Sequence, residues 1–266
     1  MALEFCIVAS GSDGNAVWVR GNGSELLIDC GVSQRDLSRS LAGLGSHPDN
    51  VAGVVCTHHH GDHASGIPAL TKRGVPVYAS AATLLQLRGR VAKEHTRAIA
   101  NRGCVSVGAL RVQAVPTSHD APGSIAVVVS DGICALGFAT DLGCKTARLV
   151  KAFSNLDAVI LESNHDDTML RYGPYPPEVK RRILGPQGHL SNADAADLLA
   201  EIAHPGLQHV VLVHLSQENN TPEHAASAVS PVLASCAPRA VLAVDRRDSL
   251  VEPITLRGTG PLFASL

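Results

Sequence analysis

The stretch from Thr57 to His63, which reads Thr-His-His-His-Gly-Asp-His, constrains this chain more than any other. It holds four histidines and one aspartate in seven residues, and a short apolar run at 51–56 comes directly before it. Imidazole and carboxylate groups are common protein ligands of divalent metals. Because crowding such groups at one strand end gives a fold no structural advantage, we predict a metal site here.

The composition favours a layered α/β fold. The chain has 266 residues, of which 45% are hydrophobic and only 3% aromatic, so Ala, Val, Leu and Ile must build the core. This length suits one globular domain, which we expect to span 1–266. The net charge of −2 neither indicates nor excludes a nucleic-acid partner, because local patches decide such contacts.

The cysteines and the first residues predict a cytoplasmic protein. Seven cysteines are scattered along the chain, without any Cys-x-x-Cys pair, and we expect them to be reduced. Residues 1–5 lack the basic start and apolar core of a signal peptide. Because no apolar run reaches the length that spans a bilayer, we expect no membrane partner. The oligomeric state is not predicted.

Hydrophobic periodicity divides the chain into strands and helices that follow one another closely. We expect strands at 3–9, 17–19, 25–31, 51–56, 75–78, 105–115 (two strands), 125–130, 133–139, 158–161, 209–213 and within 240–256. We expect helices at 33–44, 63–70, 81–101 with a break near Gly89, from 176 onward, at 193–203 and at 222–235. The pair Asp131-Gly132 predicts a hairpin turn.

One pattern repeats along the chain, in which a buried strand ends and a metal-capable residue follows at once. It occurs at His58, His119, Asp141 and His214. Strand ends are places where a rigid sheet can hold ligands in defined positions. We therefore expect these distant residues to join the cluster at 58–63.

The spacing within the cluster predicts one metal site with three nitrogen ligands. His58 and His60 are two residues apart, so in extended backbone both imidazoles face the same way. His119 is expected to complete the set. His59 alternates to the opposite side and is expected not to bind metal.

A second metal is expected beside the first. Asp62 and His63 point elsewhere and suit this second ion, with His214 as a further ligand. Asp141 is the natural bridging carboxylate. Two divalent ions held about 3.5–4 Å apart lower the pKa of a bridging water and clamp a phosphate.

The combined pattern resembles the HxHxDH motif of the metallo-β-lactamase superfamily. The matching residues, in chain order, are His58, His60, Asp62, His63, His119, Asp141 and His214. The resemblance covers nearly the whole chain. It implies an α/β fold of the αβ/βα four-layer sandwich type, with two mixed β-sheets face to face, helices outside and a dinuclear site at one edge.

Four stretches resemble more narrowly the YycJ (WalJ) family. They are 9–12 with Gly14-Asn15, then 161–166, then 188–192, and finally 214–216 with Asn219-Asn220. The resemblance implies a bacterial, cytosolic, nuclease-like phosphodiesterase. Members of the family are described as 5′-to-3′ exonucleases on double-stranded DNA, so the expected partner is a nucleic acid, in the first place DNA.

Catalytic roles follow from the order of these stretches, which resembles tRNase Z. His189 is expected to protonate the leaving oxygen, with Glu162 orienting it, and the alternative is that His189 only caps the following helix or orients a loop. Asp62 is expected to be required for catalysis. Further candidates for substrate contact are His165, Asn164, Arg181, Arg182 and Ser216, beside Arg171 and Lys180.

The metal and the reaction leave alternatives open. Zinc is the expected metal, with manganese or iron as alternatives, because imidazole and carboxylate ligands suit all three. A thioesterase of the glyoxalase II type, or another small-molecule metallo-hydrolase, is the alternative enzyme. A regulatory module with a degenerate site is the non-enzymatic alternative, and the complete ligand set argues against it.

Overall fold

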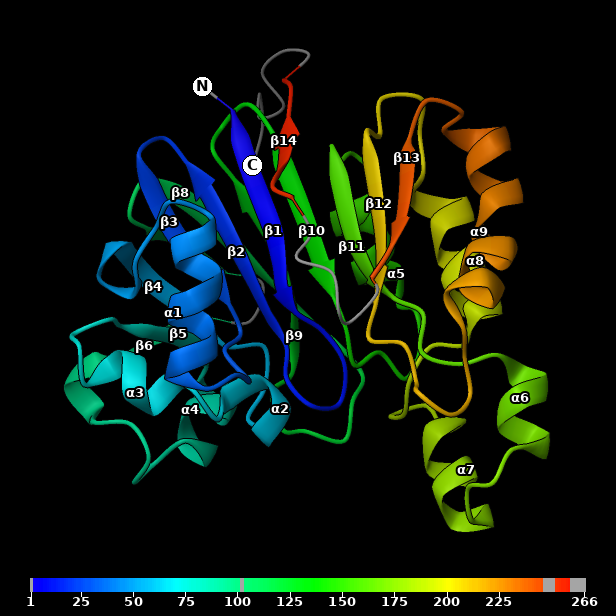
Figure 1. Cartoon of the computed structure of the whole chain (residues 1–266), viewed down its shortest axis with the longest axis horizontal. Coiled ribbons are helices and arrows are strands. Elements are labelled where there is room, and N and C mark those ends of the chain that lie inside the picture. The colour runs from blue at the N-terminus through cyan, green and yellow to red at the C-terminus, as the bar shows by residue number, and fades with distance from the viewer. Residues whose placement is uncertain (1, 101–102, 246–251, 259–266) are drawn as a thin grey trace.

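The computed structural model describes residues 2–100, 103–245 and 252–258, and their strands form two seven-stranded sheets (Figure 1). The first sheet has the order β14 (Ile254–Leu256), β1 (Leu3–Ala9), β2 (Ala16–Gly21), β3 (Ser24–Ile28), β4 (Val51–Val55), β5 (Val77–Ser80) and β6 (Thr96–Ile99). The second has the order β13 (Val241–Val244), β12 (His209–Val213), β11 (Ala158–Glu162), β10 (Ala135–Ala139), β9 (Ile125–Ser130), β8 (Leu110–Pro116) and β7 (Cys104–Val107).

Both sheets are mixed in the same way. In the first sheet β14, β1, β2 and β3 pair antiparallel, and β3 to β6 pair parallel. In the second, β7 to β10 pair antiparallel and β10 to β13 pair parallel. The antiparallel turn at Asp131-Gly132 joins β9 to β10, as the sequence predicted.

Alternation along the strands explains why two sheets pack face to face. In β12, Val211 and Val213 point into the core between the sheets, while Val210 and Leu212 point to the outer helices. The same alternation places Leu3, Phe5 and Ile7 of β1 between the sheets. Because side chains in a strand alternate between its two faces, such strands are buried on both sides.

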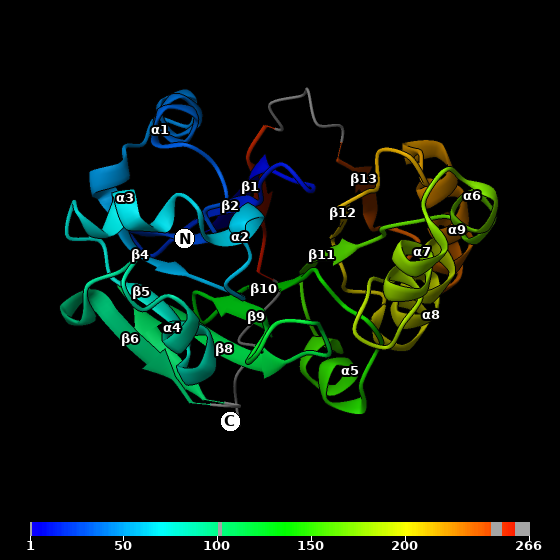
Figure 2. The same ribbon diagram turned by 90° about the horizontal axis from the view of Figure 1, so that it is seen from below.

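The helices cover the two outer faces of the sandwich. Outside the first sheet lie α1 (Gln34–Gly43), α2 (Gly61–Ala64), α3 (Ile67–Thr71) and α4 (Ala81–Gln86), with the short 3₁₀ segments η1 (Pro48–Asn50) and η2 (Lys93–His95). Outside the second lie α5 (Ala147–Phe153), α8 (Asn192–Ile202) and α9 (Pro222–Cys236). The remaining pair, α6 (Asp167–Tyr172) and α7 (Pro177–Ile183), stands at one end (Figure 2). This arrangement is the αβ/βα sandwich that the resemblance implied.

One expectation about secondary structure was wrong. The helix expected over 81–101 ends at Gln86, and Thr96–Ile99 forms strand β6 instead, while residues 101–102 lie outside the described residues. β6 pairs parallel with β5 at the sheet edge. Pairing with an existing strand outweighed local helical pattern there, which is common for short segments.

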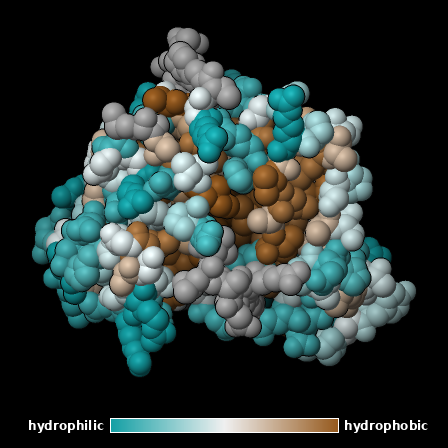
Figure 3. All heavy atoms as spheres, turned by 45° about the horizontal axis from the view of Figure 1, so that its top comes forward, coloured by the Kyte–Doolittle hydropathy of each residue, from teal (hydrophilic) through white to brown (hydrophobic). Residues whose placement is uncertain are grey.

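The two ends of the sandwich differ in character. Figure 3, in which the top of Figure 1 comes forward, shows hydrophobic residues gathered near the middle of that face. At the opposite end lie the loops that follow β4, β8, β10, β11 and β12. Within residues 2–100, 103–245 and 252–258, no helix has the length and apolar character that crossing a membrane requires.

Candidate metal centre

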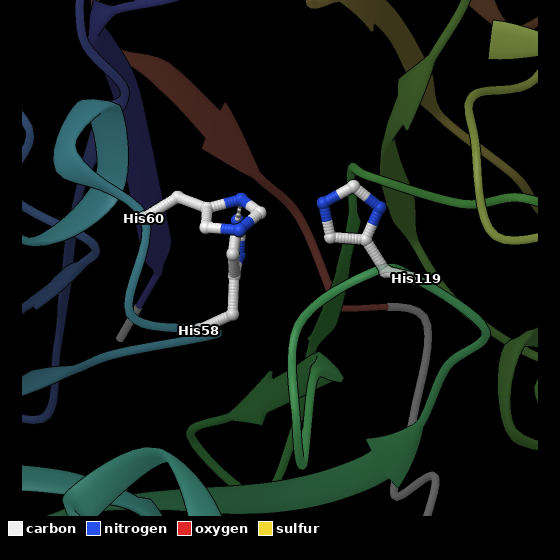
Figure 4. A group of neighbouring side chains, drawn as sticks. All are labelled: His58, His60 and His119. Carbon is white, nitrogen blue, oxygen red and sulfur yellow. Dashed lines mark hydrogen bonds between the residues drawn. The ribbon is translucent and has the colours of Figure 1, made fainter. Parts of the chain in front are cut away.

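The loop that leaves β4 brings two histidines toward a third from the opposite sheet. Nε2 of His58 lies 3.1 Å from Nδ1 of His60. His119, which follows β8, faces both, with ring centroids 5.0 Å from that of His58 and 5.3 Å from that of His60. Figure 4 shows the three imidazoles pointing into one shared space between the two loops. Their ligand atoms lie close enough together to hold one metal ion.

A second cluster lies directly beside the first. Oδ2 of Asp62 lies 3.3 Å from Nε2 of His63 and 3.9 Å from Nε2 of His214. His214 follows β12 in the second sheet, so this cluster also joins the two halves of the sandwich. These three residues form another group that could hold a metal ion.

Asp141, which follows β10, lies between the two clusters. Its Oδ1 is 3.6 Å from Nε2 of His119, and its Oδ2 is 3.1 Å from Nε2 of His63. The carboxylate of Asp141 therefore contacts residues of both clusters, since Oδ1 also lies 3.9 Å from Nδ1 of His214. A carboxylate placed between two candidate metal sites can serve both.

In four of these histidines, Nδ1 has an oxygen partner, so that Nε2 is the ring nitrogen left for a metal ion. The partners of Nδ1 are Thr57 Oγ1 for His58 (3.1 Å), Asp29 Oδ2 for His63 (2.8 Å), the Gly188 carbonyl for His119 (3.3 Å) and Glu162 Oε1 for His214 (2.8 Å). Such contacts fix the tautomer and turn Nε2 toward the cluster. Second contacts of this kind are typical of metal-binding histidines.

The cluster also contains buried polar atoms that form no hydrogen bond of good geometry. Among the described residues, these include Nε2 of His119 and Oδ2 of Asp141, whose charged neighbours Asp120 and His63 lie 3.2 and 3.1 Å away. Leaving such atoms unpaired costs free energy, so native proteins rarely do it without a reason. A divalent metal ion at this place would satisfy both, and the donor set therefore fits the group.

Charge is distributed unevenly over the cluster. Burial lowers the pKa of His63, but the carboxylates of Asp141 and Asp29 outweigh burial and raise it well above its ordinary value. Burial likewise opposes protonation of His214, whose pKa the Asp141, Asp62 and Glu162 carboxylates raise to about 10. Burial, together with the neighbouring His63 charge, lowers the pKa of His58 to about 2. The carboxylates thus attract positive charge to the centre.

The backbone is unusual where strands deliver these residues. Asp29, Asp141 and His214 have positive φ angles of 59°, 57° and 58°. Non-glycine residues rarely adopt this left-handed conformation, and those that do cluster at functional sites. At His214 the backbone N–H donates to Oγ of Ser10 at 2.9 Å, which holds the strained turn.

Glu162 connects the metal centre to His189. Its Oε1 lies 2.8 Å from Nδ1 of both His189 and His214, and its Oε2 accepts from the backbone N–H of Leu142 and Leu190. Burial raises the pKa of Glu162, but the two histidines outweigh burial and hold it at about 2. Burial lowers the pKa of His189, but the Glu162 carboxylate outweighs it and raises it. Glu162 thus orients two histidines at once.

A cavity of about 500 Å³ opens over the centre. Its wall includes His60, Asp62, His119, Asp141, His189 and His214. Of the residues expected to touch substrate, Asn164, Arg182 and Ser216 line it as well.

Four of the seven substrate candidates do not line the cavity, namely His165, Arg171, Lys180 and Arg181. His165 is only 1% exposed, and the backbone there pairs with Ser191 through an isolated β-bridge. Arg181 is exposed on α7, but it does not line the cavity as Arg182 does. The geometry therefore does not favour direct substrate contact by these residues in this cavity.

Sequence reasoning missed several residues around the centre. Asp29 holds His63, and Asp120 lies 3.2 Å from Nε2 of His119. The backbone N–H of Asn15 donates to the Asp62 carbonyl at 2.7 Å. Asp29 directly follows β3, so the pattern of metal-capable residues at strand ends could have indicated it.

Residues 24–215 match a family model described as a Beta-lactamase superfamily domain. The chain belongs to the metallo-β-lactamase superfamily. Together with the histidine and aspartate clusters, this membership makes it a metal-dependent hydrolase whose cofactors are divalent metal ions.

Relatives within the superfamily are similar over most of the chain. Exodeoxyribonuclease YycJ of Bacillus anthracis is 33% identical, covering 88% of this chain and 90% of its own length. Exodeoxyribonuclease WalJ of Streptococcus pneumoniae is 30% identical over 84% and 85%. The crystal structure of the metallo-β-lactamase fold protein YhfI from Bacillus subtilis has a TM-score of 0.73 at 17% identity, covering 96% of this chain and 99% of that one. The first two confirm the resemblance to the YycJ (WalJ) family, and the third confirms the fold.

Proposed function

We propose that this chain is a dinuclear metal-dependent phosphodiesterase that degrades double-stranded DNA from its ends, in the 5′-to-3′ direction. The observation that carries the proposal is the position of Asp141, with Oδ1 facing His119 at 3.6 Å and Oδ2 facing His63 at 3.1 Å. A pair of metal ions is well suited to clamp a phosphodiester. The relative named Exodeoxyribonuclease YycJ supports DNA as the substrate.

We assign the ligands as the two clusters divide them. His58, His60 and His119 would hold one ion, and Asp62, His63 and His214 would hold the other. Asp141 would serve both. Zinc is the proposed metal because the set is rich in imidazole, with manganese or iron as alternatives.

The residues of this chain then have defined tasks. When bound, the ions lower the pKa of a coordinated water and neutralise charge on the phosphate. Asp29, Thr57 and Glu162 hold the ligand rings in orientation through their Nδ1 atoms. The carboxylate of Asp141, which contacts His119 and His63, would contribute to both sites.

His189 is proposed as the general acid. Glu162 occupies its Nδ1 at 2.8 Å, so Nε2 is the ring atom left to donate a proton to the leaving oxygen. His189 lines the cavity beside Asp141, where the scissile phosphate would lie. The alternative role as a helix cap is not favoured, because the side chain that caps α8 is that of Ser191, in a capping box with Asp194.

Substrate contacts are proposed for three residues of the cavity wall. Arg182 would bind a backbone phosphate, and Asn164 and Ser216 would position it through polar contacts. Asn164 also joins two loops of the site, because its Nδ2 donates to the His214 carbonyl and its N–H donates to the Leu190 carbonyl.

The test is a direct comparison of substrates with the purified, metal-loaded protein. End-labelled duplex DNA should be shortened progressively, and a generic phosphodiester should be cleaved more slowly. A glutathione thioester should stay intact. Hydrolysis of the thioester alone would instead establish the glyoxalase II type of activity.

Two variants, one of them a control, test the assignment of the metal ligands. His60→Ala should lose one metal ion per chain and nearly all activity, measured by elemental analysis and nuclease assay. His59→Ala is the control, because its ring belongs to neither group of candidate ligands. Equal metal content in the two variants would contradict the assignment.

A further inference from the structure

The helical arm 167–183, formed by α6, α7 and the connection between them, carries two exposed or half-exposed tyrosines. Tyr172 is 86% exposed, and Tyr175 lines the cavity over the metal centre. Figures 1 and 2 show the arm standing at the end of the sandwich that carries the site.

These tyrosines are unusual in a chain with so few aromatic residues. The chain contains only four Phe, one Trp and three Tyr. Within the described residues, every Phe and Trp is buried in a core, and Tyr78 packs against the inner core. In the described part of the chain, the aromatic rings outside the cores are therefore the two on this arm.

The arm holds Tyr175 in a defined position. Nζ of Lys180 donates to the carbonyls of Arg171 (2.9 Å) and Gly173 (2.8 Å), which ties the connection to α7. Lys180 therefore makes its contacts within the arm. Its positive charge alone had suggested a contact with a substrate phosphate. At Gly173 an added Cβ would lie 2.5 Å from Oδ1 of Asn219, so the connection also packs closely on the body of the protein.

Two prolines restrict the same connection. Tyr175 lies between Pro174 and Pro176, and Pro177 begins α7. Proline fixes its own φ and restricts the residue before it, so little backbone entropy is lost when a ligand contacts Tyr175. A rigid aromatic ring presented in this way suits stacking.

The surroundings of Tyr175 match the parts of a nucleotide. Three further residues of the arm line the cavity, namely Val179, Arg182 and Ile183. All three lie on α7, with Val179 one helical turn before Arg182. Several of the proposed metal ligands line the same cavity. The cavity thus combines an anion-binding centre, a cation and an apolar aromatic wall within about 500 Å³, a volume typical of small-ligand sites.

We propose that Tyr175 is the wall of a nucleobase subsite, on which the base of the nucleotide being released stacks while its phosphate lies at the metal centre. The inference rests on the proposed function. Stacking accepts any base, because every base has a π-face, so the subsite would favour nucleic acid over other phosphodiesters without sequence preference.

The test couples the tyrosine ring to the base. Two end-labelled duplexes are compared, one with a normal nucleotide and one with an abasic nucleotide at the attacked end. Tyr175→Ala should raise KM on the normal duplex about 5- to 150-fold, the range that loss of one aromatic–base stack produces. On the abasic end it should act like the wild type, which also establishes that the variant is folded.

Two further variants sharpen the result. Tyr175→Phe keeps the ring and should stay within about twofold of the wild type on both duplexes. Tyr172→Ala removes the neighbouring ring, which does not line the cavity, and should leave KM unchanged.

The outcomes separate the subsite from the proposed function. A Tyr175→Ala enzyme slowed equally on both duplexes overturns the subsite and leaves the nuclease function standing. So does a Tyr172→Ala defect as large as that of Tyr175→Ala. A wild-type enzyme that degrades neither duplex overturns the nuclease function and the subsite together.

Discussion

Oδ2 of Asp29 lies 2.8 Å from Nδ1 of His63, and both side chains are fully buried. The same carboxylate accepts hydrogen bonds from the backbone N–H and the hydroxyl of Thr57, each at 2.7 Å. Asp29 therefore joins the end of β3 to the histidine loop after β4 and turns Nε2 of His63 toward Asp141. A residue outside the ligand set thus determines how a ligand points.

Replacing Asp29 by Asn should weaken metal binding without removing a ligand. Both carboxylate oxygens accept hydrogen bonds, so an amide NH₂ must face a donor, and the ring of His63 loses its fixed orientation. Loss of such an outer contact costs about 10- to 100-fold in metal affinity. Competition with a chromogenic chelator measures it.

Asp157→Asn is the matched control. Asp157 is also buried, and it accepts from the N–H of Ala135 and from Gln208, away from the metal centre. It should lower the melting temperature and leave metal affinity unchanged. If both variants bind metal equally, Asp29 has no role in orienting His63.

The ligand candidates could be predicted because each lies at a recognisable place in the sequence. Asp141 and His214 directly follow buried strands, and the sheet then brings these strand ends together. Asp29 has the same placement, but nothing in the sequence shows that β3 and β4 are neighbours, so its contact with His63 emerges only in the fold. The roles of the ligands, and the treatment of 1–266 as one domain, stay predictions.

Other parts could not be predicted for similar reasons. Strand β6 forms at Thr96–Ile99 because β5 offers an open edge, which local helical periodicity cannot reveal. His165 belongs to a stretch rich in polar residues, and only the fold, in which its backbone bridges to Ser191 and its side chain is buried, shows that the ring lies inside. Pairing between distant segments decided both cases.

Loading the protein with metal should release protons near neutral pH. In the metal-free protein, carboxylates raise the pKa of His214 to about 10 and that of His63 well above its ordinary value, against the effect of burial. At neutral pH both rings therefore favour the imidazolium form, with a proton on each nitrogen. A metal ion must displace one of these protons to bind. Metal affinity should consequently rise as pH rises toward the pKa of these rings.

Titration calorimetry in buffers of different ionisation enthalpy measures this release. The heat of binding should depend on the buffer, with protons passing from the protein to the buffer. A buffer-independent heat at neutral pH would mean that both rings are already neutral, contrary to the raised pKa values.

Gly31→Ala should disrupt the histidine loop by contact alone. A Cβ at Gly31 would overlap the carbonyl oxygen of Asp62, and it would lie 2.8 Å from the backbone nitrogen of Asn15. The backbone must move, because neither atom belongs to a flexible side chain. We expect a large fall in melting temperature and in metal content.

Gly43→Ala is the matched control, at a glycine where an added Cβ has room. Gly43 is the last residue of α1, and an added Cβ would meet nothing within 4 Å. Alanine is the better helix former by up to about 1 kcal/mol, so the variant should be as stable as the wild type or more stable. If the two variants melt alike, the close approach at Gly31 has no structural consequence.

Arg182→Ala should reduce the salt dependence of DNA binding, and Arg181→Ala should change it less. Both arginines are exposed on α7, but Arg182 lines the cavity whereas Arg181 does not. Each phosphate neutralised by an arginine releases counterions, so losing one contact lowers the slope of log K against log salt by about 1. Binding of a nuclease-resistant phosphorothioate duplex over a series of salt concentrations gives this slope. An equal change in the two variants would show that the charge of α7 as a whole, rather than its face toward the cavity, attracts the substrate.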